Sequence, residues 1–291
     1  MPLSRADIAA QAHQLLVEGY GLYLASNGPV LAELNTAPFG EALTTLDFLG
    51  QAPADAEEWS VADLMRVYNV LNATAFGDKG IPLQNWVMID LGLLPSAFLL
   101  VTLPPERARA AADEERGYAS ERARTGQVLG AVLAEADRLG YDGPIPVAGY
   151  CAAPTPVSGG WVGWSLCSAI PGLGTTTKGL GLEIYGARTL TGVAQFTDQA
   201  LRVHRKFGRM EVVSAVLDLH PVPHTLVYRT DVFSDDGEGA PTVWMEARDL
   251  AFQREMQVKI DAGTSRYYVL SPGFAENRVP LLEVLRVEDH P

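Results

Sequence analysis

The stretch PGLGTTTKGLGLEIYGARTLTGVAQFTDQALRVHRKFGRMEVV, from Pro171 to Val213, predicts helices and strands in alternation after a glycine-rich turn. The residues just before it, Trp161 to Ile170, are apolar and β-prone, which indicates a buried strand. The elements predicted after the turn are a helix opened by Thr175 and Thr176, a strand over 189–196, a helix over 198–207 and a strand over 210–219. This order places the glycines where a strand ends and a helix begins.

The run Gly172-Leu173-Gly174 has the composition of an anion-binding turn. Glycines allow a tight turn and a close approach of the backbone, and the free N–H groups of a helix N-terminus attract negative charge. Two glycines also make a plain strand-to-helix turn, and that alternative stays open. Thr177 occupies the third glycine position of the dinucleotide fingerprint, and no G-K-[ST] follows, so neither the dinucleotide nor the P-loop pattern is present.

Residues 160–230 resemble the cofactor core of the GNAT N-acyltransferases. In that family a strand leads into a loop of pattern [QR]-x-x-G-x-[GA], and a later helix ends in a motif like N-x-x-A-x-x-x-Y-x-K-x-G-F. Gly172 and Gly174 match the loop, and Ala200 to Gly208 match the helix motif with His204 in the tyrosine position. Three positions depart from the family pattern: Ala169 stands at the Gln/Arg position of the loop, and Thr197 and Arg209 stand at the Asn and Phe positions of the helix motif.

The resemblance implies an acyltransferase that moves an acyl group from acetyl-CoA or another acyl-CoA to an amine of a small molecule. The positions it implies for the CoA pyrophosphate are Ile170, Gly172, Leu173, Gly174, Thr175 and Thr176. His204 would protonate the leaving thiolate, because a histidine titrates near neutrality and can act as a general acid. His204 can equally be a surface residue among helix-end cations, and the chain can be a non-catalytic acyl-CoA-binding or interaction protein of the same fold.

The fold expected is α/β (α+β), with a mixed, mostly antiparallel sheet flanked by helices, GNAT-like, and an appended C-terminal β-rich element. The domains expected are residues 1–233, with a long helical insertion at 105–140, and residues 234–291 as the β-rich extension. The other elements expected are helices over 4–19 and 60–75, paired strands over 86–91 and 97–103, a surface loop over 36–58 and a Pro/Gly-rich connector over 141–160. The appended strands would supply an edge at which a homodimer could form.

Composition limits the classes of partner. The 291 residues carry a formal net charge of −13. That charge argues against a nucleic-acid binder and against an anionic membrane surface. The long apolar run 86–103 is interrupted by Asp90, Pro95 and Ser96, so it predicts strands rather than a membrane helix. The N-terminus lacks an apolar signal segment and the chain has two cysteines, so a cytoplasmic location is expected.

Two other chemistries are compatible with the sequence. Lys178 would form a Schiff base if an apolar setting lowered its pKa, and 179–186 faintly resembles a segment of the acetoacetate decarboxylase family. That reading makes the chain a lyase or decarboxylase, whereas the plain alternative is an exposed lysine in the first helical turn. Asp218, His220 and His224 have ligand chemistry, although a turn between strands explains them as well and no metal is predicted.

Overall fold

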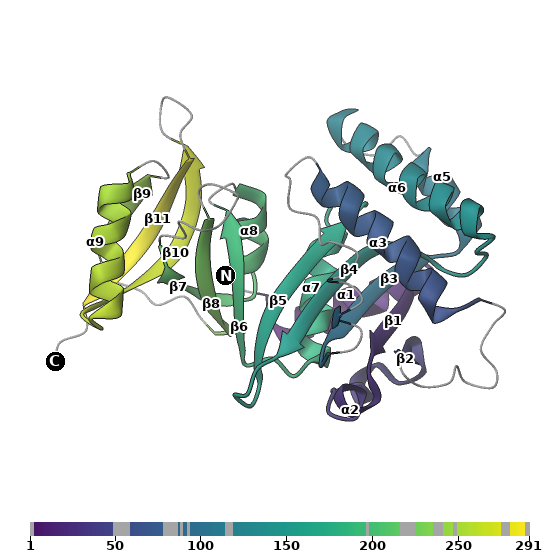
Figure 1. Cartoon of the computed structure of the whole chain (residues 1–291), viewed down its shortest axis with the longest axis horizontal. Coiled ribbons are helices and arrows are strands. Elements are labelled where there is room, and N and C mark those ends of the chain that lie inside the picture. The colour runs from purple at the N-terminus through teal and green to yellow at the C-terminus, as the bar shows by residue number, and fades with distance from the viewer. Residues whose placement is uncertain are drawn as a thin grey trace. The chain divides into compact units, whose positions relative to one another are not determined.

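Figure 1 shows the computed structural model, which describes residues 3–48, 59–77, 87, 90–91, 94–113, 119–195, 198–215, 225–234, 241–246, 249–274 and 280–288. The fold is mixed α/β, with a mostly antiparallel open sheet flanked by helices. The helices are α1 (Arg5–Val17), α2 (Gly28–Leu31), the 3₁₀ helix η1 (Ala37–Ala42), α3 (Val61–Gly77), α5 (Pro105–Ala112), α6 (Ala119–Leu139), α7 (Leu173–Ile184), α8 (Asp198–Arg205) and α9 (Leu250–Asp261). The strands are β1 (Gly21–Ser26), β2 (Leu43–Asp47), β3 (Ala97–Leu103), β4 (Ile145–Pro154), β5 (Gly160–Ser168), β6 (Thr189–Gln195), β7 (Gly208–Ser214), β8 (Thr225–Val232), β9 (Thr242–Glu246), β10 (Ser265–Phe274) and β11 (Pro280–Glu288).

The chain divides into two compact units. The N-terminal unit comprises 6–154 and 163–186, and the C-terminal unit comprises 1–5, 155–162 and 187–291. The expected boundary after residue 233 does not coincide with this division. Strands β9, β10 and β11 belong to the same unit as β6, β7 and β8, because β10 pairs with β7. The C-terminal β-rich element therefore continues a sheet rather than forming a separate body.

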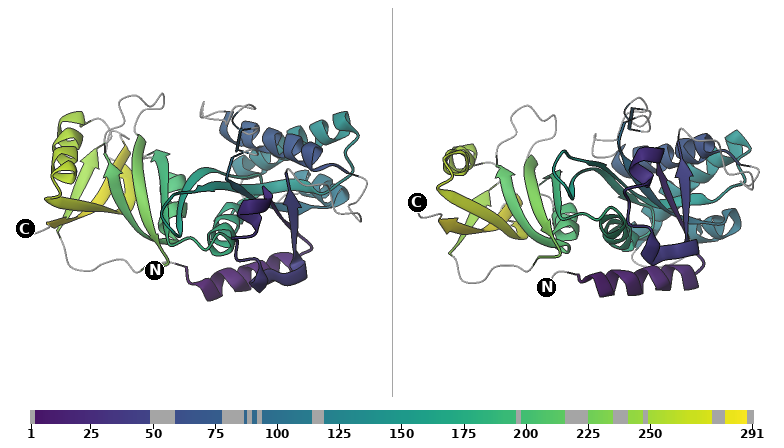
Figure 2. Two further views of the ribbon diagram at one scale, coloured as in Figure 1. Left: turned by 60° about the horizontal axis from the view of Figure 1, so that its bottom comes forward. Right: turned by 90° about the horizontal axis from the view of Figure 1, so that it is seen from below.

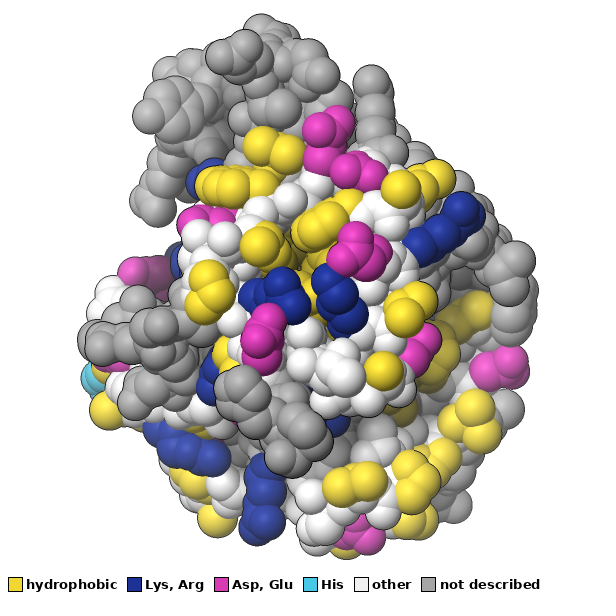
Figure 3. Space-filling view, turned by 90° about the vertical axis from the view of Figure 1, so that its left-hand side faces the viewer, with side chains coloured by type: hydrophobic (Ala, Val, Ile, Leu, Met, Phe, Trp, Pro, Cys, Tyr) yellow, Lys and Arg dark blue, Asp and Glu magenta, His cyan; other side chains and the backbone are white. Residues whose placement is uncertain are grey.

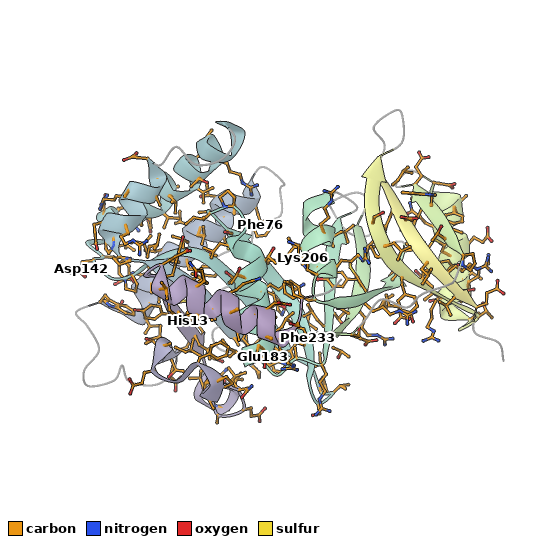
Figure 4. The ribbon with its side chains drawn as sticks, turned by 180° about the vertical axis from the view of Figure 1, so that it is seen from behind. His13, Phe76, Asp142, Glu183, Lys206 and Phe233 are labelled. Carbon is orange, nitrogen blue, oxygen red and sulfur yellow. The ribbon has the colours of Figure 1, made fainter. Side chains whose placement is uncertain are left out.

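The N-terminal unit has a sheet with helices on both of its faces (Figure 2). Its strand order is β2-β1-β3-β4-β5, and α3, α5 and α6 lie on one face of these strands while α7 lies on the other. Consecutive residues of β4 show the two faces, since Gly149 lies against Tyr68 of α3 and Tyr150 lies against Gly181 of α7. Figure 4, in which His13 marks α1 and Glu183 marks α7, shows α1 on the outer side of α7. Helix α7 is therefore enclosed between α1 and the sheet.

The α3 helix illustrates how local signals fix an element. The Ser60 hydroxyl accepts a hydrogen bond from the Asp63 N–H at 3.1 Å and donates to the Asp63 carboxylate at 2.7 Å. This N-cap begins the helix at the predicted place. The apolar residues predicted for its inner face, Leu64, Val67, Leu71 and Ala75, are all buried. The predicted N-terminal helix is likewise present as α1, with Ile8 and Leu15 buried.

Some of the other predictions for this unit are wrong. Strand β2 lies in the expected loop 36–58, and β4 lies in the expected connector 141–160. Residues 87, 90 and 91 are helical, so the expected strand over 86–91 is not formed at those positions, while the rest of it lies outside the described residues. The expected helical region 105–140 is confirmed as two helices, α5 and α6. Strand β3 was predicted correctly, but it pairs with β1 and β4.

The C-terminal unit holds the start of β5 and the strand order β6-β8-β7-β10-β11-β9. Residues Gly160–Val162 of β5 pair in parallel with Thr189–Thr191 of β6, whereas β6 pairs with β8, and β8 with β7, in antiparallel fashion. In the edge strand β9, Met245 is buried and its neighbour Trp244 is 52 % exposed. One face of the sheet is thus packed at that strand, and the other is open.

Candidate functional site

The turn between β5 and α7 is held in one conformation by its neighbours. The Ser168 hydroxyl donates to the Ile170 carbonyl at 2.6 Å, and the Ile170 N–H donates back to that hydroxyl at 3.2 Å. The Thr125 hydroxyl donates to the Ala169 carbonyl at 2.9 Å, and so ties the turn to α6. Because these side chains fix the backbone, the amide groups that follow have defined directions.

Gly172 is the N-cap of α7. Its φ of 84° lies in the left-handed region, which glycine adopts at little cost. The amides of Leu173 and Thr175 donate within the turn, at 3.3 Å to Ile170 and at 3.1 Å to Gly172. Among the residues that the structure describes, the N–H groups of Gly172 and Gly174 have no hydrogen-bond partner. The turn therefore offers two glycine amides at the positive end of a helix.

The predicted role of the threonines as helix caps is wrong. Helix α7 begins at Leu173, and its N-cap makes no side-chain hydrogen bond. The Thr176 hydroxyl instead donates to the Gln11 amide oxygen of α1 at 3.0 Å, and the buried Thr177 hydroxyl donates to the Leu173 carbonyl at 2.9 Å. These two hydroxyls hold the helix in place, because both are engaged within the protein.

Lys178 was expected, in one alternative, to be an exposed lysine in the first helical turn. That alternative is wrong, because the side chain is buried. It is 0 % exposed, and burial lowers the pKa of its ammonium from 10.5 to about 7. Gly174, Lys178, Gly181 and Tyr185 recur at helical spacing on one face of α7. A Cβ at Gly181 would lie 2.5 Å from the Tyr150 ring of β4, so this face points at the sheet. The glycines let α7 approach the sheet closely on either side of the lysine.

His204 lies near the end of α8, in the C-terminal unit. Its ring packs against Tyr228 of β8, with the centroids 5.0 Å apart and the planes at 31°. The structure thus brings the predicted residues Ile170 to Thr176 together in one turn, and it assigns His204 to the other unit. Sequence reasoning missed Tyr228, although alternation along β8 marks it as inward-facing.

The two cysteines are buried free thiols. Burial raises the pKa of the Cys167 thiol to about 12 and that of Cys151 well above its ordinary value. Both are therefore protonated near neutral pH and unsuited to attack a substrate. Cys167 is buried as predicted, and its thiol donates a hydrogen bond to the Tyr68 hydroxyl of α3 at 3.9 Å. The metal alternative rests on Asp218, His220 and His224, which lie outside the described residues.

The molecular surface shows no concentration of one charge on the face drawn in Figure 3, where basic, acidic and apolar side chains are interspersed. On α9, Lys259 pairs with Glu255 at 2.5 Å, and Val258 between them in sequence is 67 % exposed. No helix within the described ranges is both long and apolar enough to cross a membrane. We compared the chain with models of known protein families, with curated proteins and with solved structures, and none of them matched.

Proposed function

We propose that this protein binds an acyl-CoA and transfers the acyl group to an amine of a small molecule, as the resemblance to the GNAT N-acyltransferases implies. One observation carries the proposal: β5 and β6 are adjacent parallel strands within a mostly antiparallel sheet, and each is followed by a helix. In α/β sheets, ligands favour the carboxyl ends of such strands, where helix N-termini begin. The glycine turn stands at the end of β5.

The CoA pyrophosphate binds the N–H groups of Gly172 and Gly174 in this proposal. Anions at a helix N-terminus are stabilised by free amides and by the helix dipole, and this holds even on a protein of net charge −13. The amine nitrogen of the acceptor attacks the thioester carbonyl, and the carbon–sulfur bond then breaks. The family resemblance gives His204 the role of proton donor to the leaving thiolate, while the amine loses a proton to solvent.

A thermal-shift titration with acetyl-CoA and longer acyl-CoAs tests the binding step. At ten times Kd, binding stabilises the folded state by about 1.4 kcal/mol, or roughly 2 °C in Tm. Gly172→Glu should abolish the shift, because a carboxylate would then stand at the anion site. Gly186→Glu is the matched control, since Gly186 ends the same helix with a φ of 60° and open space around its Cβ position.

The outcomes separate binding from catalysis. No shift with any CoA ester at millimolar concentration would overturn the proposal, as would an equal loss in both glycine variants. His204→Ala should keep the shift and lower turnover, and unchanged turnover would remove the histidine from the acid role. A shift without turnover in the unaltered protein identifies a non-catalytic acyl-CoA-binding protein.

A second candidate, a Schiff-base lyase or decarboxylase, is favoured by the lowered pKa of Lys178. A lysine that is neutral near pH 7 can attack a carbonyl, and water leaves as the imine forms. The side chain is 0 % exposed, so a substrate would reach it only if the elements packed around it separated. Borohydride with acetoacetate, followed by mass spectrometry, would add mass to the peptide containing Lys178. The same treatment of Lys178→Met is the control, and no adduct in the unaltered chain refutes this candidate.

A further inference from the structure

The contact between His204 and Tyr228 lies inside the C-terminal unit and joins a helix to the middle of a sheet. Tyr228 is 2 % exposed, and its strand β8 lies between β6 and β7. On the same face its cross-strand neighbours are Gly192 of β6 and Val212 of β7. The tyrosine ring is thus fixed by two strands beneath the imidazole.

Gly192 accounts for where the tyrosine lies. A Cβ at that position would lie 2.6 Å from the Tyr228 hydroxyl oxygen and 2.7 Å from Cζ, well inside van der Waals contact. The ring therefore leans over β6 because the facing strand has no side chain there. Burial also raises the pKa of Tyr228 far above its ordinary value, so the ring that His204 meets is neutral.

We propose that Tyr228 is a positioning residue, which fixes the orientation of the His204 ring, and that Gly192 is the glycine that makes this position possible. The inference rests on the proposed function, in which His204 donates the proton to the leaving thiolate. An aromatic surface against one face of an imidazole restricts its side-chain torsions. The ring contact, rather than the tyrosine hydroxyl, supplies this effect.

Substitutions separate the ring from the hydroxyl. Aromatic contacts of this kind correspond to a factor of about 3–10 in an equilibrium or a rate, so Tyr228→Leu should lower kcat about 3- to 10-fold and leave KM for acyl-CoA unchanged. Tyr228→Phe should retain kcat, because the ring face remains. Gly192→Ala should act like Tyr228→Leu, since its methyl displaces the ring. Val193→Ala is the matched control, because Val193 is the next residue of β6 and is 49 % exposed.

A double-mutant cycle distinguishes positioning from general stability. If Tyr228 acts only through His204, Tyr228→Leu should cause no further loss of kcat in a His204→Ala background. Equal losses in both backgrounds would overturn the proposal, and so would loss of activity in Tyr228→Phe with the fold intact.

An NMR measurement tests the orientation without any activity. The tyrosine ring current should shift the His204 ring protons in the unaltered chain, and Tyr228→Leu and Gly192→Ala should remove the shift while Val193→Ala keeps it. An unshifted imidazole in the unaltered chain refutes the positioning role. If the shift behaves as expected but the protein neither binds CoA nor transfers an acyl group, the contact between the two rings is confirmed and the proposed function is refuted.

Discussion

Lys178→Met should raise the stability of this protein, although it removes a lysine that the fold encloses completely. The ammonium is 0 % exposed, and its pKa falls from 10.5 in the unfolded chain to about 7 in the folded state. This lowering of the lysine pKa by about 3.5 on folding corresponds to roughly 5 kcal/mol. Methionine fills a similar volume without a charge, and the lost polar contacts of the lysine offset about 1 kcal/mol. We expect a gain of about 3–5 kcal/mol at pH 6.

The gain should depend on pH in a defined direction. At pH 6 the amine is protonated in both states, so the full cost of burying the charge is present. Above pH 7 the folded state loses the proton while the unfolded chain keeps it up to about 10.5, so the free energy of unfolding rises by about 1.4 kcal/mol per pH unit. The advantage of Lys178→Met should therefore shrink by about 2 kcal/mol between pH 6 and pH 8.5.

Urea unfolding of both proteins at pH 6, 7 and 8.5, followed by circular dichroism, measures this difference directly. Comparing the two proteins at each pH cancels the titration of the other groups. Lys206→Met is the control, since Lys206 is exposed on the C-terminal unit and its loss should change stability by less than about 0.5 kcal/mol. A Lys178→Met protein that is less stable at pH 6, or a difference independent of pH, would refute the reasoning.

Three further outcomes are expected. Tyr185→Phe should cost about 1–3 kcal/mol in urea unfolding, because its buried hydroxyl accepts the Leu99 N–H at 3.1 Å and donates to the Tyr150 carbonyl at 2.9 Å. Gly181→Ala should cost about 1–3 kcal/mol in the same assay, since the added Cβ falls 2.5 Å from the Tyr150 ring; an unchanged midpoint would contradict the close approach. Cys151 and Cys167 should resist a thiol reagent in the folded protein and react at once in urea; fast labelling of the native chain would contradict their burial.

The helices and strands from 160 onward could be predicted because their signals are local. Glycines and prolines separate short apolar runs, and the order from β5 to β8 follows directly. Strand β4 was missed because Pro146 and Gly149 suggest a connector. In the structure, a register shift in β3 lies beside Pro146, and the Tyr68 ring fills the space over Gly149. Both residues are accommodated by partners far away in the chain, which no local pattern reveals.

In the candidate site, too, local features could be predicted from the sequence, whereas contacts between distant parts of the chain could not. The turn at Gly172 follows from a strand, two glycines and a helix in succession. The burial of Lys178 could not be predicted from the local sequence, because it depends on α1 and the sheet, which enclose α7 from both sides. The neighbour of His204 also lay beyond prediction, since Tyr228 comes from a strand 24 positions later that pairs with β6.

The chain passes several times between its two units, and this has a practical consequence for the design of truncated proteins. The changes of unit fall after residues 5, 154, 162 and 186, and β5 is itself divided between the units. A fragment ending at 154 would lack α7, and a fragment starting at 187 would lack the first residues of β5 that pair with β6. Neither unit corresponds to a continuous piece of sequence, so deletion mapping that assigns an activity to one half of the chain would report misfolding instead.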